Sequence, residues 1–144
     1  FLKFLLAMKK PARILEVGTA VGFSAILMAE YDPVPCQITT IENYEKRIPI
    51  ARENFKRAGK EAQITLLEGD AGEILAGLSG SFDFIFMDAA KGQYINWLPD
   101  ILRLLRDGGL SKVPSIRPQF QLQGSCSEPP ASPSSLRAML SPCG

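Results

Sequence analysis

Short runs rich in apolar or β-branched residues alternate with segments of helical spacing along most of the chain. The four runs, each bounded by turn residues, are 14–17, 37–41, 64–67 and 82–87. Helical patterns follow them at 23–30, 48–58, 71–78 and 95–105, and Pro49 falls in the first turn of the second helix. Buried strands that alternate with helices are typical of a parallel sheet with right-handed crossovers. The pattern therefore predicts an α/β fold, a Rossmann-like doubly wound parallel sheet with the strand order 3-2-1-4.

The stretch RILEVGTAVGFS, residues 13–24, predicts a strand, a glycine turn and the start of a helix. Gly18 and Gly22 permit a tight turn with a close backbone approach, and the free amides of a helix N-terminus follow them. In doubly wound sheets, such a turn faces a ligand beyond the carboxyl ends of the strands. The two glycines do not have the dinucleotide spacing G-x-G-x-x-G, so an ordinary turn is an equally good interpretation of this stretch alone.

Two acidic residues follow the second and third predicted strands. Glu42 lies about 20 residues beyond the glycine turn, the separation at which a carboxylate accepts hydrogen bonds from a ribose diol. A solvated carboxylate at a strand end is the alternative for this residue. Asp70 is placed either to contact an adenine amino group or to cap a helix, and the two roles are compatible.

The run FDFIFM, residues 82–87, leads directly into Asp88 and then Lys91. A carboxylate and a lysine at the end of a buried strand are costly unless they meet a ligand, each other or solvent. The structural alternatives are a helix N-cap for Asp88, a solvated side chain for Lys91 and a packed aromatic ring for Tyr94.

Composition favours one soluble globular domain. The chain has 144 residues, 46% of them hydrophobic, and a net charge of +1, which gives no case for or against a polyanionic partner. The three cysteines, at positions 36, 126 and 143, fit neither a disulfide framework nor a C-x-x-C metal site, which favours the reducing cytoplasm. The apolar run 1–8 is too short for a membrane span and predicts the end of a helix. We therefore expect a cytoplasmic protein without a membrane partner.

Four motifs together resemble one enzyme family over residues 1–110. They are RILEVGTAVGFS, ITTIEN, LLEGDA and FDFIFMDAAKGQY. In this order they resemble the catechol-type and caffeoyl-CoA-type O-methyltransferases, which use S-adenosylmethionine and a divalent metal. The segment MDAAKGQY is most similar to bacterial members that methylate 5-hydroxyuridine in tRNA. The resemblance implies an enzyme, an O-methyltransferase.

The resemblance also implies a role for each residue of the cofactor site. Glu16, Gly18 and Gly22 would shape the pocket, and the Ser24 hydroxyl would hold the methionine carboxylate; Glu42 would bind the ribose, Asp70 and Ala71 would border the adenine, and Asp88 would lie where the cofactor and metal sites meet. The amides at 22–24 would bind the same methionine carboxylate, because a helix N-terminus favours anions.

Asp88 and Lys91 would carry the reaction. Methyl transfer from a sulfonium is an in-line displacement, which requires the acceptor oxygen to lie close to the methyl carbon and to become anionic. The resemblance makes Asp88 a ligand of Mg²⁺ or another divalent ion, which would lower the pKa of that oxygen. Lys91 would be the general base or would orient the acceptor, and Tyr94 would border it. The acceptor would be a hydroxyl of tRNA 5-hydroxyuridine or of a catechol-like molecule, and the oligomeric state is open between a monomer and a homodimer.

The chain departs from the family after residue 110. Family members complete the metal site with Asp-Asn after a fifth strand, and no Asp-Asn follows Gly109 here. Residues 111–144 are rich in proline and serine, with Glu128 the one acidic residue, and predict an irregular tail that is not native family sequence. We therefore expect a partial S-adenosylmethionine-binding domain at 1–110, with the fourth strand as an unpaired apolar edge.

Two further interpretations stay open. The missing metal ligands favour a catalytically impaired fragment that binds S-adenosylmethionine without turnover. A nicotinamide-dependent dehydrogenase is disfavoured, because the turn lacks the third glycine spacing.

Overall fold

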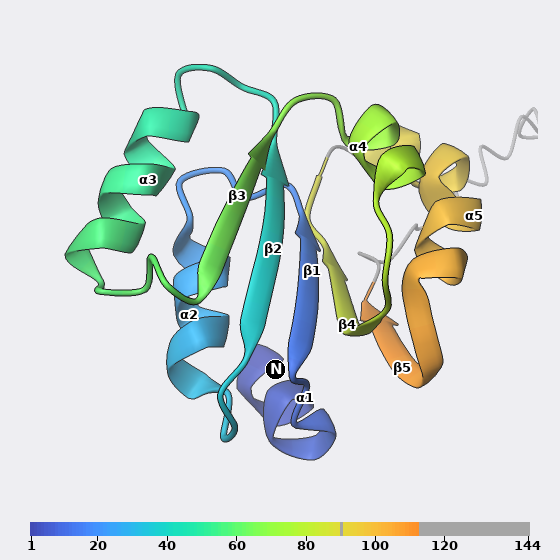
Figure 1. Cartoon of the computed structure of the whole chain (residues 1–144), viewed down its shortest axis with the longest axis horizontal. Helices are drawn as coiled ribbons and strands as arrows, with labels where there is room; N and C mark the ends of the chain where they lie inside the picture. The colour runs from blue at the N-terminus through green and yellow to red at the C-terminus, as the bar shows by residue number, and fades with distance from the viewer. Residues whose placement is uncertain (90, 113–144) are drawn as a thin grey trace, which may run out of the picture.

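The strand β1 (Arg13–Val17) lies at the centre of a five-stranded parallel sheet with the order β3-β2-β1-β4-β5 (Figure 1). The computed structural model describes residues 1–89 and 91–112. Its other strands are β2 (Gln37–Glu42), β3 (Ile64–Glu68), β4 (Phe82–Met87) and β5 (Leu105–Lys112). The predicted order 3-2-1-4 is confirmed, and Val17 pairs in register with Ile41 of β2 and Met87 of β4. The carboxyl ends of these three strands therefore lie side by side.

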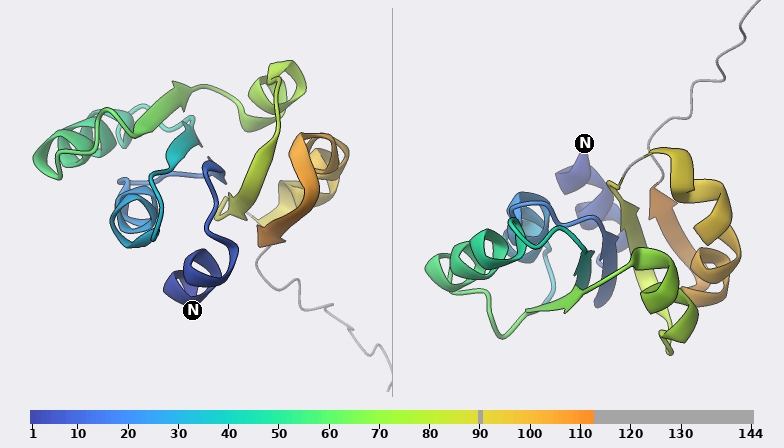
Figure 2. Two further views of the ribbon diagram at one scale, coloured as in Figure 1. Left: turned by 60° about the horizontal axis from the view of Figure 1, so that its bottom comes forward. Right: turned by 90° about the horizontal axis from the view of Figure 1, so that it is seen from above.

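Helices cover both faces of the sheet (Figure 2). They are α1 (Leu2–Lys9), α2 (Phe23–Tyr31), α3 (Ile48–Arg57), α4 (Ala71–Gly77), the 3-10 helix η1 (Lys91–Gln93) and α5 (Tyr94–Leu104). One apolar cluster joins the sheet to α1, α2 and α3, and a second joins its other face to α4 and α5. Ile14 belongs to the first cluster and Leu15 and Val17 to the second, and all three are fully buried. Burial on both faces explains why apolar residues occupy successive positions in β1, as at Ile14 and Leu15.

The predicted helices agree with the structure to within two residues at each end. The helix α3 begins at Ile48 with Pro49 in its first turn, as expected from the fixed φ angle of proline. No helix of the described residues is long and apolar enough to cross a membrane.

The prediction that β4 is an unpaired edge was wrong, because β5 pairs with it in parallel. Phe82 pairs with Leu105 and Phe84 with Leu110, so a bulge takes up the extra residues of β5. Gly109 lies in this bulge, where a Cβ atom would be 2.8 Å from the carbonyl oxygen of Arg106. The strand runs two residues past the predicted domain boundary at 110. The predicted tail lies, from residue 113 onward, outside the described residues.

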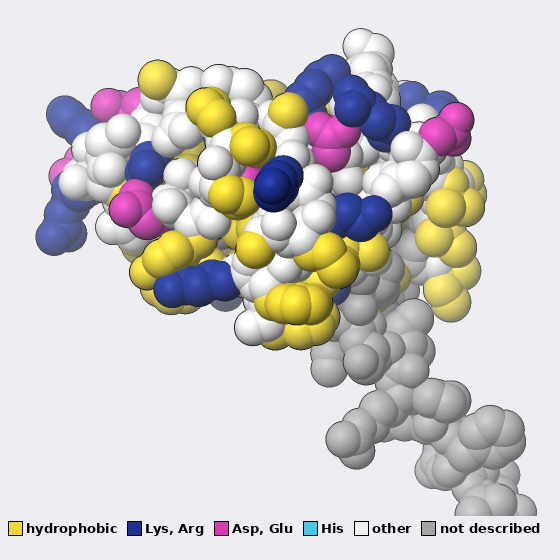
Figure 3. All heavy atoms as spheres, turned by 90° about the horizontal axis from the view of Figure 1, so that it is seen from below, with side chains coloured by type: hydrophobic (Ala, Val, Ile, Leu, Met, Phe, Trp, Pro, Cys, Tyr) yellow, Lys and Arg dark blue, Asp and Glu magenta, His cyan; other side chains and the backbone are white. Residues whose placement is uncertain are grey.

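Asp83 joins the amino ends of three strands. Its Oδ2 accepts hydrogen bonds from the N–H groups of Ala12, at 3.0 Å, and Arg13, at 2.9 Å. Its Oδ1 lies 2.8 Å from a guanidinium nitrogen of Arg106 in β5. Figure 3 shows basic side chains around acidic ones at this lower end of the sheet, where Asp83 and Arg106 line a small hollow with Lys9 and Lys10. This carboxylate therefore fixes β5 to the rest of the sheet.

We expect Asp83→Ala to lower the free energy of unfolding by about 2 kcal/mol, since it removes charge-assisted hydrogen bonds from a side chain that is 16% exposed. Glu68→Ala is the control, because the Arg52–Glu68 pair has side chains that are 57% and 44% exposed. Its loss should change the free energy by less than about 1 kcal/mol. Urea denaturation measures both, and equal losses would contradict the role given to Asp83.

Candidate functional site

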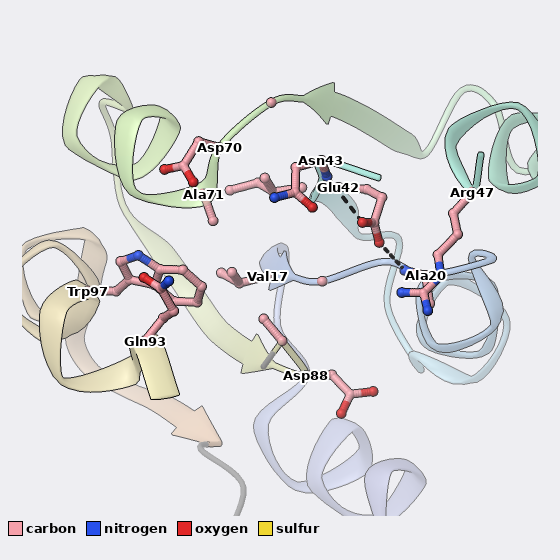
Figure 4. A pocket seen from close by; sticks show the side chains of 14 residues that line it. Val17, Ala20, Glu42, Asn43, Arg47, Asp70, Ala71, Asp88, Gln93 and Trp97 are labelled. Atoms are coloured by element: carbon pink, nitrogen blue, oxygen red, sulfur yellow. Dashed lines mark hydrogen bonds between the residues drawn. The ribbon is translucent and has the colours of Figure 1, made fainter. Parts of the chain in front are cut away.

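A cleft of about 270 Å³ opens at the carboxyl ends of β1, β2 and β4, beside the start of α4 (Figure 4). Five residues predicted from the sequence line it, namely Gly18, Glu42, Asp70, Ala71 and Asp88. Glu16, Gly22 and Ser24 do not line it. The cleft lies where the strand order reverses, which is the place at which open α/β sheets bind ligands.

Gly18 brings the turn after β1 against the turn after β4. Its φ of +96° lies in the region that favours glycine. A Cβ atom at this position would lie 3.0 Å from the backbone nitrogen of Ala89 and 3.0 Å from the carbonyl carbon of Asp88. The N–H of Asp88 also donates to the Val17 carbonyl at 2.9 Å. The predicted order 3-2-1-4 makes the first and fourth strands neighbours, and their carboxyl ends do lie in contact.

Gly22 is required by packing outside the cleft. Its φ is +88°, and an added Cβ atom would lie 2.5 Å from Cε1 of Phe55 in α3. The glycine therefore lets the turn pass close to a ring that is 3% exposed. Gly22 therefore affects the cleft only indirectly, because it sets the course of the backbone in the turn after β1.

Glu16 is fully buried beneath the turn and accepts hydrogen bonds from three hydroxyl groups. Thr19 donates at 2.7 Å and Thr40 at 2.5 Å, and Ser24 also donates to this carboxylate. Ser24 was assigned to a cofactor carboxylate, but here its hydroxyl is directed at Glu16, so that assignment stays a prediction. The network ties β1 to β2 and α2 and supports the turn from below.

Burial raises the pKa of Glu16 above its usual value of 4.5, the three hydroxyl hydrogen bonds lower it in part, and the charge of Asp88 adds to the rise. Because the folded-state pKa exceeds the unfolded one, the stability contributed by Glu16 is complete below about pH 4.5 and is lost as the pH rises through the folded pKa. A buried carboxyl group therefore weakens the fold toward alkaline pH.

We expect Glu16→Gln to remove this loss, so that the variant gains stability relative to the wild type as the pH rises. The gain should be about 1.4 kcal/mol for each unit by which the pKa is raised. Urea denaturation of both proteins at about pH 5 and about pH 8 measures the difference, in which other titrating groups cancel. A difference that does not change with pH would contradict the prediction.

Glu42 lies at the end of β2 and is 7% exposed. The alternative interpretation of Glu42 as a solvated carboxylate is therefore wrong. Its Oε2 accepts from the Ala20 N–H at 2.7 Å, and its Oε1 accepts from the N–H groups of Asn43, at 3.1 Å, and Tyr44, at 3.0 Å. A carboxylate has about four lone-pair sites, so one is left for a ligand in the cleft. Glu42 thus holds the glycine turn against β2 while it lines the cleft.

Asp70 is the N-cap of α4, as one of its two predicted roles requires. Its Oδ1 accepts from the N–H groups of Gly72, at 2.8 Å, and Glu73, at 3.2 Å. Its Oδ2 has no hydrogen-bond partner among residues 1–89 and 91–112. Cap and cleft contact therefore coexist, because one oxygen serves the helix and the other is left for a donor.

Asp88 has an exposed side chain whose carboxylate points away from Trp97 in Figure 4. Lys91 begins η1, and its side chain lies outside the described part of the chain, so its catalytic role stays a prediction. Tyr94 is 4% exposed, and its hydroxyl donates to the Ala89 carbonyl. Burial raises the pKa of the Tyr94 hydroxyl, and the charge of Asp88 adds to this. Tyr94 is a packed aromatic residue and does not line the cleft.

The described residues do not complete a metal site. In residues 1–89 and 91–112, no three His, Cys, Asp or Glu side chains lie close enough together to hold a metal ion. Asp88 supplies one carboxylate, whereas Mg²⁺ takes about six oxygen ligands, several of them water. Among the described residues, Asp88 can therefore supply one ligand to such an ion, but the remaining protein ligands of a metal site are not present.

The sequence patterns missed several residues that line the cleft, including Ala20, Asn43, Arg47, Gly69, Gln93 and Trp97. Asn43 and Gly69 are the chain neighbours of the predicted site residues Glu42 and Asp70. Their position next to strand ends could have indicated that they line the cleft. Arg47 precedes α3, and Trp97 lies within α5. Only the packing of these helices brings the two side chains to the cleft.

Comparison with known proteins finds similarity to methyltransferases. A family model described as O-methyltransferase matches residues 1–116. A catechol O-methyltransferase of Niastella koreensis is 38% identical over 114 residues, which cover 76% of this chain and 52% of that protein. A caffeoyl-CoA O-methyltransferase of Stellaria longipes is 31% identical over 115 residues, covering 76% and 48%. The chain spans about half the length of the curated relatives that it matches.

Two solved structures show the same likeness in three dimensions. A methyltransferase of Podospora anserina bound to S-adenosylhomocysteine (SAH) has a TM-score of 0.73 and 37% identity, with 76% of this chain and 48% of that chain covered. An O-methyltransferase from Bacillus cereus in complex with SAH has a TM-score of 0.69 and 33% identity, with 74% and 50% covered.

Proposed function

The chain belongs to the O-methyltransferase family, and we propose that its cleft binds S-adenosylmethionine for transfer of a methyl group to a hydroxyl acceptor. The bound SAH in two structural relatives supports this choice of cofactor. Because the chain spans about half the length of its relatives, the methyl-transfer activity of the whole enzyme is part of the proposal.

The charge of the cleft is the observation that carries the proposal. Among the described residues that line it, Glu42, Asp70 and Asp88 are acidic and Arg47 alone is basic. These carboxylates suit the hydroxyl and amino donors of a nucleoside and the positive charge of a sulfonium. The diphosphate of a nicotinamide cofactor would instead face three negative charges, which disfavours the dehydrogenase.

Four residues of the chain, Glu42, Asp70, Asp88 and Lys91, have a defined part in this proposal. Glu42 accepts from one ribose hydroxyl with its remaining lone-pair site, and Asp70 accepts from the adenine amino group with Oδ2. Asp88 places negative charge beside the sulfonium end, and Lys91 orients the acceptor or takes its proton. The bound cofactor supplies a methyl group on a sulfonium sulfur, which keeps the bonding electron pair while the acceptor oxygen forms the new bond.

The finer parts of the proposal are the acceptor, the ion and the assembly. The names of the relatives favour a catechol-like hydroxyl, and tRNA 5-hydroxyuridine is the second acceptor we propose, on the similarity of MDAAKGQY. Mg²⁺ would have Asp88 as one ligand, and the roles proposed for Glu42, Asp70 and Lys91 do not depend on this ion. A cytoplasmic location and a homodimer complete the proposal.

A catalytically impaired fragment is the second candidate function. It is favoured because, among residues 1–89 and 91–112, no group of three metal-binding side chains accompanies Asp88, and because the sequence has no Asp-Asn after residue 109. Such a chain would bind the cofactor and lack turnover.

Calorimetric titration of the full chain tests the proposal. We expect SAH to bind and NAD⁺ not to bind, and the reverse result would overturn the proposal. Transfer assays with a catechol and with unmodified tRNA, each with and without Mg²⁺, then separate the two candidates. Turnover that is lost in Asp88→Ala supports the enzyme, whereas SAH binding without turnover selects the impaired fragment.

A further inference from the structure

Trp97 is the one tryptophan of the chain, and its indole lines the cleft across from Asp70 and Ala71 (Figure 4). The side chain is 8% exposed, so neighbouring groups hold it in place. The ring of Tyr94 meets it edge to face, with centroids 6.3 Å apart and planes at 68°. Gly72 leaves room for it, since a Cβ atom there would lie 3.3 Å from Nε1 of Trp97. The indole is thus fixed from two sides, and part of its surface is left for the cleft.

One half of the cleft lining is mostly apolar, with Asp70 and Gln93 as its polar residues, and the other half is polar. Val17, Ile41, Ala71, Ala89 and Trp97 line the cleft and belong to one apolar cluster that continues into the core. Glu42, Asn43 and Arg47 line the polar half, and Figure 4 shows Glu42 and Arg47 on the side away from Trp97. A nucleoside has a flat base of low polarity and a sugar rich in hydroxyl groups. It therefore fits this cleft in one direction, with the base toward Trp97.

We propose that Trp97 forms the wall of the nucleobase end of the cleft and contacts the adenine of the cofactor with its indole. This inference rests on the proposed function and adds a residue that determines which end of the cleft the base occupies. Asp70 supplies the hydrogen-bond acceptor at that end, and Trp97 supplies aromatic surface, which favours any base. Contact between a nucleic acid base and an aromatic side chain strengthens binding by roughly tenfold or more.

Intrinsic fluorescence tests the contact directly, because no second tryptophan contributes to the emission. We expect SAH and adenosine each to change the emission of the full chain with a saturating titration curve, and methionine alone to cause no change. The SAH midpoint should agree with the affinity from calorimetry. An emission that stays constant while calorimetry shows SAH binding would overturn the inference and leave the proposed function intact.

The variant Trp97→Leu separates base contact from a general effect on the fold. Its affinity for SAH should fall at least tenfold, whereas its affinity for S-ribosylhomocysteine, which lacks the base, should stay unchanged. The control Ile95→Ala changes a residue of α5 that is 76% exposed and should leave both affinities unchanged.

Equal losses for the two ligands in Trp97→Leu would show a structural role and overturn the inference. If circular dichroism shows that this variant does not fold, the fluorescence of the wild type decides. Failure of SAH to bind the wild type in calorimetry would overturn the proposed function, and the inference with it.

Discussion

Replacing Gly18 with alanine is expected to lower the free energy of unfolding by about 3 kcal/mol and to abolish measurable SAH binding. The φ of +96° disfavours any residue with a Cβ atom. The new methyl group would also lie 3.0 Å from backbone atoms of Asp88 and Ala89, which have no rotamer by which to move away. The turns after β1 and β4 would have to separate, and the cleft lies between them. Urea denaturation and calorimetry measure the two effects.

The control for this variant is Gly59→Ala. Gly59 has a φ of +66°, but no atom lies within 4 Å of the position that its Cβ would take. This substitution costs only the unfavourable backbone conformation, about 1 kcal/mol, and should leave SAH affinity unchanged. The difference between the variants therefore measures the close approach of the two turns. Equal losses of stability would contradict the importance of that approach.

The central strands could be predicted because they are buried on both faces. FDFIFM predicts β4 at its observed bounds, since a short and mostly apolar run bounded by turn residues is typical of a buried strand. The predicted order 3-2-1-4 then came from the doubly wound fold class, and the sheet contains it.

The strand β5 could not be predicted from its residues. LRDGGLSK has neither alternation nor a continuous apolar run, and it follows α5 without a loop. Its pairing depends on backbone hydrogen bonds to β4, on a glycine bulge and on the contact of Arg106 with Asp83. These are properties of the assembled sheet.

The sequence predicts which residues line the cleft when they lie at the end of a strand. It predicts them less well when the direction of the side chain decides whether a residue reaches the cleft. Glu42 and Asp70 lie at strand ends, so both reach the cleft. Glu16 lies between Leu15 and Val17, and because successive side chains of a strand point to opposite faces, it is directed at Ser24 beneath the turn. A sequence motif therefore shows which residues lie near the turn, whereas the folded strand determines where each side chain points.

Replacing Glu42 with glutamine is expected to lower SAH affinity at least tenfold and the free energy of unfolding by about 1–3 kcal/mol. The carboxylate accepts from Ala20 through one oxygen and from Asn43 and Tyr44 through the other. Glutamine has one oxygen, so its NH₂ group must face a backbone N–H on one of the two sides. A donor would also replace an acceptor where a ribose hydroxyl is proposed to bind. Calorimetry and urea denaturation measure the two losses.

Glu68→Gln is the matched control, because Glu68 ends β3 as the register partner of Glu42. Its carboxylate pairs with Arg52 at the surface and does not line the cleft, so SAH affinity should be unchanged and the stability loss under about 1 kcal/mol. A Glu42→Gln protein that loses stability yet binds SAH like the wild type would limit Glu42 to holding the turn, and the ribose contact would have to be assigned elsewhere. Parallel loss of affinity in both variants would instead place the effect in the charge of the sheet edge, because Glu42 and Glu68 end adjacent strands.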